Sequence, residues 1–490
     1  MKKAIIVGAG IGGIGAAVRL AAKGYEVEVF EANAYAGGKL TEIMVGNYRF
    51  DAGPSLFTLP KLVDELFELC GKTPKEHFEY TRLDEFTRYF YDDGTQITAY
   101  SEPEKFAHEI ETKTGEPAEN VVRFLAKSKE LYELTAHIFL YSSLHNLKTY
   151  LNTKAVTTFL KLYKIDSFRT MHKANESYFK DPRIVTLFNR FATYNGSNPF
   201  KAPATLNVIP HLEHNIGAFF PNKGMHAISQ SLFDLAKSLG VKFHFNSKVS
   251  KINTVGKKTV GITVNEKEIN ADIVVCNMDI VHAYRKLLPQ LKEPSKITNQ
   301  SKSSSAIIFY WGIKKTFSQL HLHNIFFSND YNAEFDAIFN NQTLYNDPTV
   351  YINITSKLKN DDAPEGCENW FVMINVPHNS GQNWKQMVQE ARKNILKKLS
   401  NRLGENIEVL IEAEDVLDPV LIEERTSSHL GALYGSNSNN WYSAFLRHAN
   451  FSSQVKDLYF CGGSVHPGGG IPLSLLSAKI VADLITEKES

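Results

Sequence analysis

Cysteine is scarce in this sequence. Only four of the 490 residues are cysteines, and Cys70, Cys276, Cys367 and Cys461 form no Cys-x-x-Cys pair. Thiolate zinc sites and disulfide frameworks need closely spaced or numerous cysteines, so neither is expected. We predict no metal site, and this cysteine usage fits a reducing cytoplasm.

An excess of charge of either sign is also missing. The chain has 54 Lys and Arg residues against 53 Asp and Glu residues, which gives a formal net charge of +1. Proteins that bind nucleic acids usually carry a clear basic excess. The composition therefore argues against a nucleic-acid partner.

Long hydrophobic runs are absent as well. No uncharged apolar run of about 18 residues occurs, so no transmembrane helix is predicted. The first 15 residues join two lysines to an apolar stretch, but that stretch contains five glycines and continues into a helical pattern, so we expect no signal peptide. A soluble protein, or one that lies on a membrane surface, is expected. Its 490 residues, 43% of them hydrophobic, suffice for two or three domains with a large core.

The clearest motif in the sequence is a glycine-rich segment near its amino terminus. Residues 4–7 form a short apolar run, typical of a parallel strand that is buried on both faces. The segment GAGIGG follows at residues 8–13, then a helical pattern to Lys23, then a second strand that ends at Glu31. A lone GxGxxG is also found in ordinary glycine-rich turns, but here all parts of a dinucleotide site occur in the required order. The segment therefore predicts a Rossmann-type dinucleotide site.

Each residue of this motif has a physical task. Gly8 permits the tight turn, Gly10 lets the backbone approach a pyrophosphate, and Gly13 allows the helix to pack closely on the strand. The pyrophosphate lies at the start of the helix, beside Gly12, where free N–H groups favour an anion. Glu31 accepts hydrogen bonds from the ribose hydroxyls and would repel a 2′-phosphate, which argues against NADP.

A second glycine pair follows six residues after Glu31. Gly37 and Gly38 predict another close approach to the cofactor, with Lys39 near its phosphates and with Pro54 and Ser55 after the next strand pattern. Taken alone, the glycine pair could be a turn before a hairpin. The arrangement resembles the FAD domain of the amine oxidase and phytoene desaturase superfamily, and FAD is therefore the expected cofactor.

The middle and the end of the chain contribute further expected cofactor contacts. Residues 226–239 predict a helix, and residues 242–248 and 271–277 predict strands. In the flavoproteins that this unit resembles, the backbone at the position of Val249 contacts adenine; a second independent α/β unit is the alternative. Near the carboxy terminus a strand ends in glycines before an apolar helix at about residues 473–485, whose start would face an anionic or electron-rich part of the flavin. The expected contacts in this last segment are Gly462, Gly463, Ser464, Ile471 and Pro472.

With this segment the sequence closely resembles the carotenoid desaturases of the bacterial phytoene desaturase type. The resemblance covers nearly the whole chain, including residues 194–200, 323–328, 347–351 and 363–367. The family's ending reads approximately GAGTHPGAGIPG, and this chain has GGSVHPGGGIPL at residues 462–473. The departures Val465, Gly469 and Leu473 are more similar to the branch that makes the 3,4 double bond of 1-hydroxylated acyclic or monocyclic carotenoids.

This resemblance implies flavin chemistry without a catalytic triad. A hydride passes to flavin N5 and a proton leaves the neighbouring carbon, while the protein supplies position and electrostatics. His466 is a candidate for proton transfer or for orienting the ring, with a backbone hydrogen bond in a glycine-rich turn as the alternative. Arg190, Tyr194 and Arg447 are candidates to line a substrate tunnel, with structural roles as the alternative. The electron acceptor is left open between oxygen and a quinone.

Residues 131–164 combine apolar positions at three- and four-residue spacing with several lysines. An interfacial helix on anionic lipid would show this pattern, and so would a core-facing helix with a solvated cationic side. Because a carotenoid dissolves in the bilayer, we expect peripheral docking on the inner face of the cell membrane, with the protein otherwise cytoplasmic. The apolar positions are Leu131, Leu134, Ile138, Tyr141, Leu144, Leu147, Leu151, Phe159, Leu160, Leu162 and Tyr163, and the lysines are Lys148, Lys154, Lys161 and Lys164.

The expected fold is α/β, and α+β overall. We predict a Rossmann-type FAD domain from residues 1–80, 215–285 and 450–490, a β-sheet substrate domain from 81–110 and 286–449, and a helical, membrane-facing insertion at 111–214. The leading functional hypothesis is a carotenoid 3,4-desaturase. The alternatives are a phytoene desaturase that acts earlier, an amine oxidase, and a non-catalytic flavin-containing lipid carrier.

Overall fold

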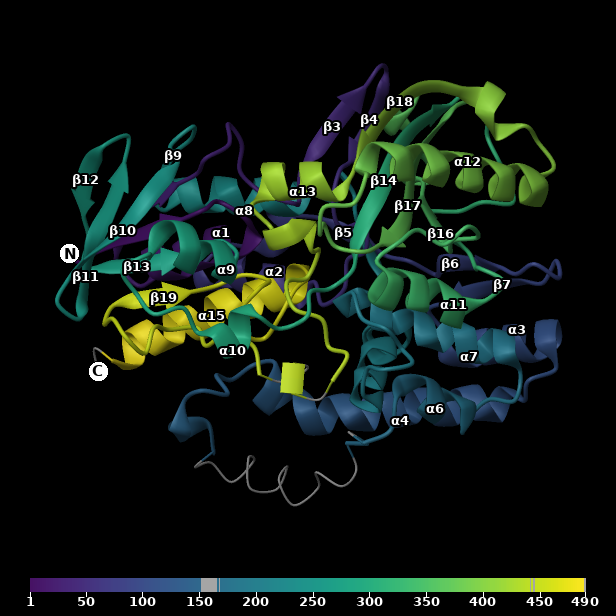
Figure 1. Cartoon of the computed structure of the whole chain (residues 1–490), viewed down its shortest axis with the longest axis horizontal. Helices are drawn as coiled ribbons and strands as arrows, with labels where there is room; N and C mark the ends of the chain where they lie inside the picture. Colours follow the sequence, from purple (N-terminus) through teal and green to yellow (C-terminus); the bar gives the residue numbers. More distant parts are fainter. Residues whose placement is uncertain (151–164, 167, 441, 444–445, 489–490) are drawn as a thin grey trace.

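The computed structural model describes residues 1–150, 165–166, 168–440, 442–443 and 446–488. Its nucleotide-binding part is built on a five-stranded, fully parallel sheet in the order β19-β13-β1-β2-β9 (Figure 1). Three distant parts of the chain supply these strands. They are β1 (Lys3–Val7), β2 (Glu26–Phe30), β9 (Lys242–His244), β13 (Ile273–Cys276) and β19 (Leu458–Phe460).

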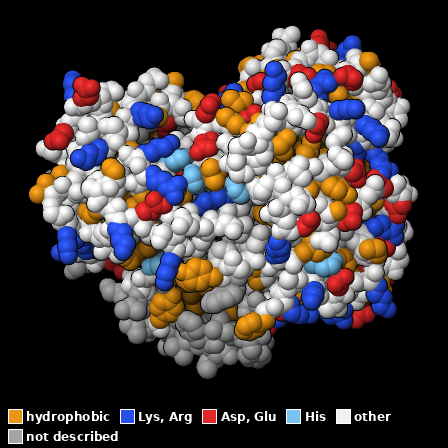
Figure 2. Space-filling model, viewed as in Figure 1, with side chains coloured by type: hydrophobic (Ala, Val, Ile, Leu, Met, Phe, Trp, Pro, Cys, Tyr) orange, Lys and Arg blue, Asp and Glu red, His pale blue; other side chains and the backbone are white. Residues whose placement is uncertain are grey.

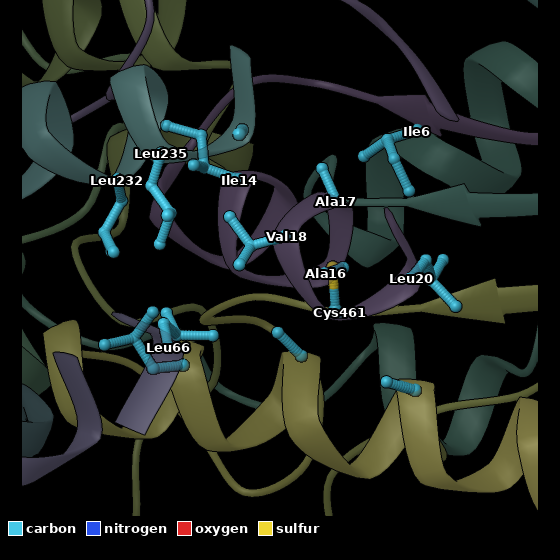
Figure 3. Packing of buried hydrophobic residues seen from close by; sticks show 14 of the residues in the cluster. Ile6, Ile14, Ala16, Ala17, Val18, Leu20, Leu66, Leu232, Leu235 and Cys461 are labelled. Carbon is cyan, nitrogen blue, oxygen red and sulfur yellow. The ribbon is translucent and has the colours of Figure 1, made fainter. Parts of the chain in front are cut away.

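Four helices cover one face of this sheet. They are α1 (Ile11–Ala22), α2 (Lys61–Leu69), α8 (His226–Ser238) and α15 (Ile471–Glu487). Figure 3 shows Ile14 and Val18 of α1 beside Leu232 and Leu235 of α8, with Leu66 of α2 below them. All five side chains are at most 2% exposed. Leu475 and Leu476 of α15 belong to the same cluster, so the first and last long helices of this part share one core.

The other face of the sheet carries a small antiparallel sheet of three strands. These are β10 (Val249–Val255), β11 (Lys258–Val264) and β12 (Lys267–Asn270). Ile252 and Ile262 pack with Val274 and Phe460 of the parallel sheet, together with α9 (Ile280–His282) and η7 (Ala283–Leu287). Both faces are therefore buried, which explains the continuous apolar runs of β1 and β13.

A seven-stranded mixed sheet forms the second part, in the order β18-β14-β17-β16-β15-β6-β7. Its strands are β6 (Glu85–Phe90), β7 (Gln96–Tyr100), β14 (Ser305–Ile313), β15 (His323–Phe326), β16 (Val350–Asn353), β17 (Glu368–Val376) and β18 (Ile411–Leu417). The helix α12 (Trp384–Leu403) packs on one face, against Trp311 and Trp370. The other face presents Tyr310 and Phe371 to the hairpin of β3 (Glu42–Val45) and β4 (Tyr48–Asp51), which brings the two parts of the molecule together.

A helical region packs against the β6–β7 end of that sheet through an aromatic core that includes Phe86, Phe106, Phe124 and Phe188. Its elements are α3 (Pro103–Thr114), α4 (Ala118–Phe139), η2 (Leu147–Tyr150), α6 (Met171–Glu176), α7 (Pro182–Asn189), η4 (Arg190–Asn195), η5 (Ala204–Val208) and η6 (His211–Ile216). The remaining elements are η1 (Pro74–Glu76), β5 (Tyr80–Arg82), β8 (Phe219–Pro221), α10 (Ser295–Thr298), α11 (Tyr331–Asp336), η8 (Ala337–Asn341), η9 (Thr355–Lys357), η10 (Asn360–Asp362), η11 (Ile407–Leu410), α13 (Pro419–Thr426) and η12 (His429–Gly431).

The expected α/β class with a discontinuous Rossmann-type domain is confirmed by the parallel sheet. The division into three domains stays a prediction, and four of its boundaries, at residues 80, 110, 214 and 285, fall inside β5, α3, η6 and η7. A single helix over residues 131–164 is wrong, because α4 ends at Phe139. Leu131 and Ile138 are buried within the protein, as in the core-facing alternative.

Most of the other positions of that expected amphipathic segment are not described by the structure. Leu151, Lys154, Phe159, Leu160, Lys161, Leu162, Tyr163 and Lys164 lie outside the described residues, as do the side chains of Leu147 and Lys148. Within the described part of the chain, no helix has both the length and the apolar character needed to cross a membrane.

Candidate functional site

One cavity of about 1580 Å³ runs from the carboxyl ends of the parallel strands to the seven-stranded sheet and the helical region. It exceeds the roughly 300–1,000 Å³ of an ordinary ligand pocket, so it has room for a dinucleotide and a second molecule. Sequence-predicted site residues line it from both ends of the chain and from the middle. They are Gly8, Gly10, Gly12, Glu31, Gly37, Gly38, Lys39, Pro54, Ser55, Val249, Gly462, Gly463, Ser464, His466, Ile471 and Pro472.

Gly13 is the predicted site residue that does not line the cavity. A Cβ atom at this position would lie 2.1 Å from the carbonyl oxygen of Gly8. Gly13 therefore serves the close packing of α1 on the first glycine turn, which agrees with the task that the motif predicts for it.

The two glycine loops, one near each end of the chain, lie side by side. A Cβ atom on Gly12 would come within 3.1 Å of the Cα atom of Gly462. Asn277, directly after β13, fills the space between them, because its side chain would be 2.8 Å from a Cβ atom on Gly10 and 2.6 Å from one on Gly462. Larger residues at these positions would therefore clash with Asn277 or with the other loop.

Two helices begin at this cavity without a side-chain cap. The N-cap residues are Gly10 for α1 and Gly470 for α15, and neither helix has an acidic residue in its first turn. The first N–H groups of a helix have no partner within the helix, and the helix dipole favours negative charge there. Two such starts facing one cavity are suited to a diphosphate.

Glu31 is fixed at the end of β2. Its two carboxylate oxygens accept hydrogen bonds from the backbone N–H groups of Ala9, at 2.7 Å, and Asn33, at 2.8 Å. The residue is only 7% exposed and lines the cavity. Each oxygen keeps a lone pair for a further donor, as expected for a group that binds ribose hydroxyls.

The second glycine pair approaches the first turn directly. The N–H group of Gly37 donates to the carbonyl of Ala9 at 2.8 Å, and Gly37 and Gly38 have φ angles of 109° and 60° that favour glycine. The next residue, Lys39, donates from Nζ to the carbonyl of Leu433 at 2.8 Å. Burial lowers the pKa of the Lys39 ammonium to about 8, against the opposing effect of the Asp279 carboxylate.

His466 also lines the cavity, but its side chain is engaged with the backbone. Its Nε2 atom lies 2.8 Å from the carbonyl oxygen of Ser142 and donates to it, because a carbonyl can only accept. Burial lowers the pKa of His466 to about 4, so the ring is neutral at neutral pH. This geometry corresponds to the backbone-bonding alternative, and it ties the loop after α4 to the last glycine-rich segment.

Arg190, Tyr194 and Arg447 line the same cavity and are held by specific partners. Arg447 donates to the carbonyls of Tyr434 and Ser436, each at 2.9 Å, and so shapes the loop that precedes the last glycines. Arg190 donates to the hydroxyl of Tyr194 at 2.9 Å. These contacts give Arg447 a structural role and leave Arg190 and Tyr194 on the wall of the cavity.

Beyond the glycine loops the cavity becomes largely apolar. The seven-stranded sheet contributes Ile308, Phe371 and Met373, and the helical region contributes Phe139, Leu206 and Ile209. A passage between these two walls fits an extended hydrocarbon better than a polar substrate, because it removes apolar surface from water.

Sequence reasoning missed several residues of this cavity. Asn277 could have been found as the polar residue that directly follows a buried strand. His323 and Tyr351 line the cavity, and Glu213 binds the cavity residue Arg190. The three come from elements far apart in the chain and carry no local signal for their association.

Comparisons with known proteins identify the class that this fold and site define. A family model described as flavin containing amine oxidoreductase matches residues 11–486, and the chain belongs to this family of flavin-dependent oxidoreductases. The predicted resemblance to carotenoid desaturases is confirmed within it. The chain is 52% identical over 485 residues to a 1-hydroxycarotenoid 3,4-desaturase of Flavobacterium sp. (strain P99-3), with 99% of each chain covered.

More distant relatives agree with this placement. The chain is 31% identical over 502 residues to a phytoene desaturase of Phycomyces blakesleeanus, which covers 99% of this chain and 85% of the relative. Among solved structures, a cyclohexylamine oxidase from Brevibacterium oxydans is similar with a TM-score of 0.61 and 15% identity, over 100% of both chains. An identity this low establishes the shared fold alone.

The residues of the cavity fit FAD, the cofactor that membership of this flavin-containing family indicates. Two uncapped helix starts suit its diphosphate, and the carboxylate of Glu31 suits its ribose. The glycines between them provide a cradle that a Cβ atom would fill. The residues at this end of the cavity therefore fit a dinucleotide of the FAD type.

Proposed function

We propose that this protein is an FAD-dependent carotenoid desaturase that introduces the 3,4 double bond into a 1-hydroxylated acyclic or monocyclic carotenoid. The observation that carries the proposal is the continuity of one cavity from the glycine loops to the apolar passage. The 52% identity to a 1-hydroxycarotenoid 3,4-desaturase, over 99% of both chains, supports this class of substrate. The identity to a phytoene desaturase is only 31%, so the alternative of a desaturase that acts earlier, on phytoene, has weaker support.

In this proposal the predicted cofactor residues have separate tasks. Gly8, Gly10, Gly12 and Gly13 shape the turn before α1, and Glu31 and Val249 border the adenosine half. Gly37, Gly38 and Lys39 approach the phosphates from the opposite side. Pro54, Ser55, Gly462, Gly463, Ser464, Ile471 and Pro472 would hold the remaining part of the cofactor toward the apolar passage.

The chain's contribution to the reaction is binding and orientation. Bound FAD supplies an acceptor for a hydride, that is, for two electrons and one proton. The apolar walls at Ile308, Phe371 and Phe139 hold the hydrocarbon in an extended form and exclude water from the reacting carbons. The second proton leaves the neighbouring carbon, and the pKa of about 4 that burial gives His466 makes that residue a weak base.

We further propose that the protein docks on the inner face of the cell membrane and passes the electrons to oxygen or a quinone. Large apolar side chains are exposed at Tyr141, at 36%, Phe168, at 101%, and Tyr442, at 39%. Figure 1 places the loop after α4 and the segment at residues 442–443 along the same lower edge of the molecule. Figure 2 shows hydrophobic side chains gathered at that edge, which supports a contact with lipid.

An anaerobic titration tests the enzymatic proposal. Purified holoprotein is mixed with a 1-hydroxylated acyclic carotenoid, and the flavin and carotenoid spectra are followed together. We expect bleaching of the oxidised flavin and a product that is two hydrogens lighter and absorbs at longer wavelength. Oxidation of phytoene alone would favour the earlier desaturase, and carotenoid binding without flavin reduction would favour a lipid carrier.

A further inference from the structure

Two nitrogen donors in the wall of the cavity have no hydrogen-bond partner among the residues that the structure describes. They are Nε of Arg190 and Nε2 of His323, and both atoms are shielded from solvent. Arg190 is 7% exposed and His323 is 2% exposed, and both line the cavity. A buried donor without an acceptor is costly, so each marks a place where a ligand atom can make a hydrogen bond.

The proton of His323 is assigned to Nε2 by its neighbours. Burial, with the charges of His321 and Arg190, lowers the pKa of His323 to about 3, so the ring is neutral. The amide of Asn353 donates to the carbonyl of Leu322 at 3.0 Å and is oriented to donate to Nδ1 of His323 at 3.1 Å. Nδ1 is therefore an acceptor, and the unpartnered Nε2 carries the hydrogen.

The side chain of Arg190 is held in place by several hydrogen bonds. Its terminal nitrogens donate to the hydroxyls of Tyr194, at 2.9 Å, and Tyr89, at 2.8 Å, and to Glu213 at 3.2 Å. Tyr194 also donates to Glu213. The carboxylate of Glu213 balances the guanidinium, so the free Nε–H suits a neutral oxygen better than a second anion.

Arg190 and His323 lie at the end of the apolar passage that is nearer to the predicted cofactor contacts. The hydroxyl of Tyr351 lies 2.7 Å from Nδ1 of His323 and 2.7 Å from Oγ of Ser55, one of the predicted cofactor contacts. Since Nδ1 accepts from Tyr351, Ser55 donates to Tyr351, and the chain of hydrogen bonds runs from the cofactor side to His323. Arg190 is anchored next to the same strand, because it donates to the hydroxyl of Tyr89 in β6, and Tyr89 pairs with Ile325, two residues along β15 from His323.

We propose that Arg190 and His323 form a binding subsite for the terminal hydroxyl of the substrate, with Nε of one and Nε2 of the other donating to its oxygen. The inference rests on the proposed function and deepens it. In a 1-hydroxylated carotenoid the oxygen-bearing carbon is separated by a single carbon from the bond that is oxidised. A hydroxyl held here therefore sets which carbons lie against the cofactor, and Arg190 and His323 determine specificity.

The test compares a 1-hydroxylated derivative of an acyclic carotene with its parent carotene. The measured quantity is the ratio of kcat/KM for the two substrates with holoprotein. The wild type is expected to favour the hydroxylated substrate at least tenfold, and the variants Arg190→Lys and His323→Phe each to lower that ratio about tenfold, because each loses one donor. Arg183→Lys is the matched control, since Arg183 is bound to Asp181 and Asp93 and does not line the cavity.

The outcomes separate the subsite from the enzymatic proposal. Equal oxidation of both substrates by the wild type, or an unchanged ratio in either folded variant, overturns the subsite and leaves the desaturase intact. Oxidation of neither substrate by the wild type overturns the proposed function and the subsite with it. The comparison of the two substrates with the wild type can by itself refute the subsite. The test therefore remains decisive even if one of the variants does not fold.

Discussion

The carboxylate of Glu31 gives the first prediction at the scale of single residues. Glu31→Ala is expected to weaken FAD binding about 10- to 100-fold, because the ribose loses an acceptor and two backbone donors lose theirs. Fluorescence quenching of free FAD measures this. The control is Glu28→Gln on the same strand, since Glu28 pairs with Lys3 and His244 and does not line the cavity. Equal loss of FAD in both variants would contradict the role of Glu31.

Lys39 predicts a pH dependence of cofactor binding. Its free-protein pKa of about 8 means that the ammonium is charged below pH 8 and neutral above it. A nearby phosphate stabilises the charged form, so binding raises this pKa, and affinity is lost as the pH rises through 8. We expect the FAD dissociation constant to rise about tenfold between pH 7 and pH 9.5.

Two variants serve as controls for this pH profile. Lys39→Met should bind FAD weakly at both pH values and show a flat profile. Lys257→Met, in the exposed turn between β10 and β11, should keep the wild-type profile. A wild-type affinity that is constant over the range would place Lys39 away from the phosphates.

At the scale of elements, the start of α1 can be tested by adding one methyl group. In Gly12→Ala the new Cβ atom would lie 2.8 Å from Oδ1 of Asn277 and 3.1 Å from the backbone of Gly462. In Gly15→Ala, one turn later, it meets Leu475 Cδ2 at 3.1 Å, where a flexible side chain can move. We expect at least a tenfold loss of FAD affinity for Gly12→Ala and near-normal flavin content for Gly15→Ala. The ratio of flavin to protein absorbance in purified samples decides between them.

Much of the element plan could be predicted from the sequence because its signals are local. The expected helix at residues 226–239 corresponds to α8, and the strand at 271–277 contains β13. The apolar spacing after residue 131 was misleading because it continues past Phe139, where α4 ends. The cluster of Arg190, Glu213, His323 and Tyr351 could not be predicted, because η4, η6, β15 and β16 meet only through tertiary packing.

At the scale of the whole molecule, the exposed apolar edge predicts binding to lipid. The double variant Tyr141→Asp/Phe168→Asp is expected to reduce the fraction that floats with anionic liposomes several-fold, because charged side chains resist burial among acyl chains. Val255→Asp is the control, since Val255 is 70% exposed in the hairpin of β10 and β11, which lies above the lower edge of the molecule in Figure 1. Wild-type protein that stays at the bottom of the gradient would remove the membrane proposal.

The parallel sheet has a consequence for biosynthesis. β19 pairs with β13, and α15 packs against α1, so elements from the last forty or so residues complete a cradle that the first residues begin. A growing chain on the ribosome therefore carries an unfinished site until β19 and α15 have been made. We expect flavin to be captured only after α15 has emerged, which makes the cell's free cofactor pool, and not loading onto the first part of the chain, the determinant of how much holoprotein forms.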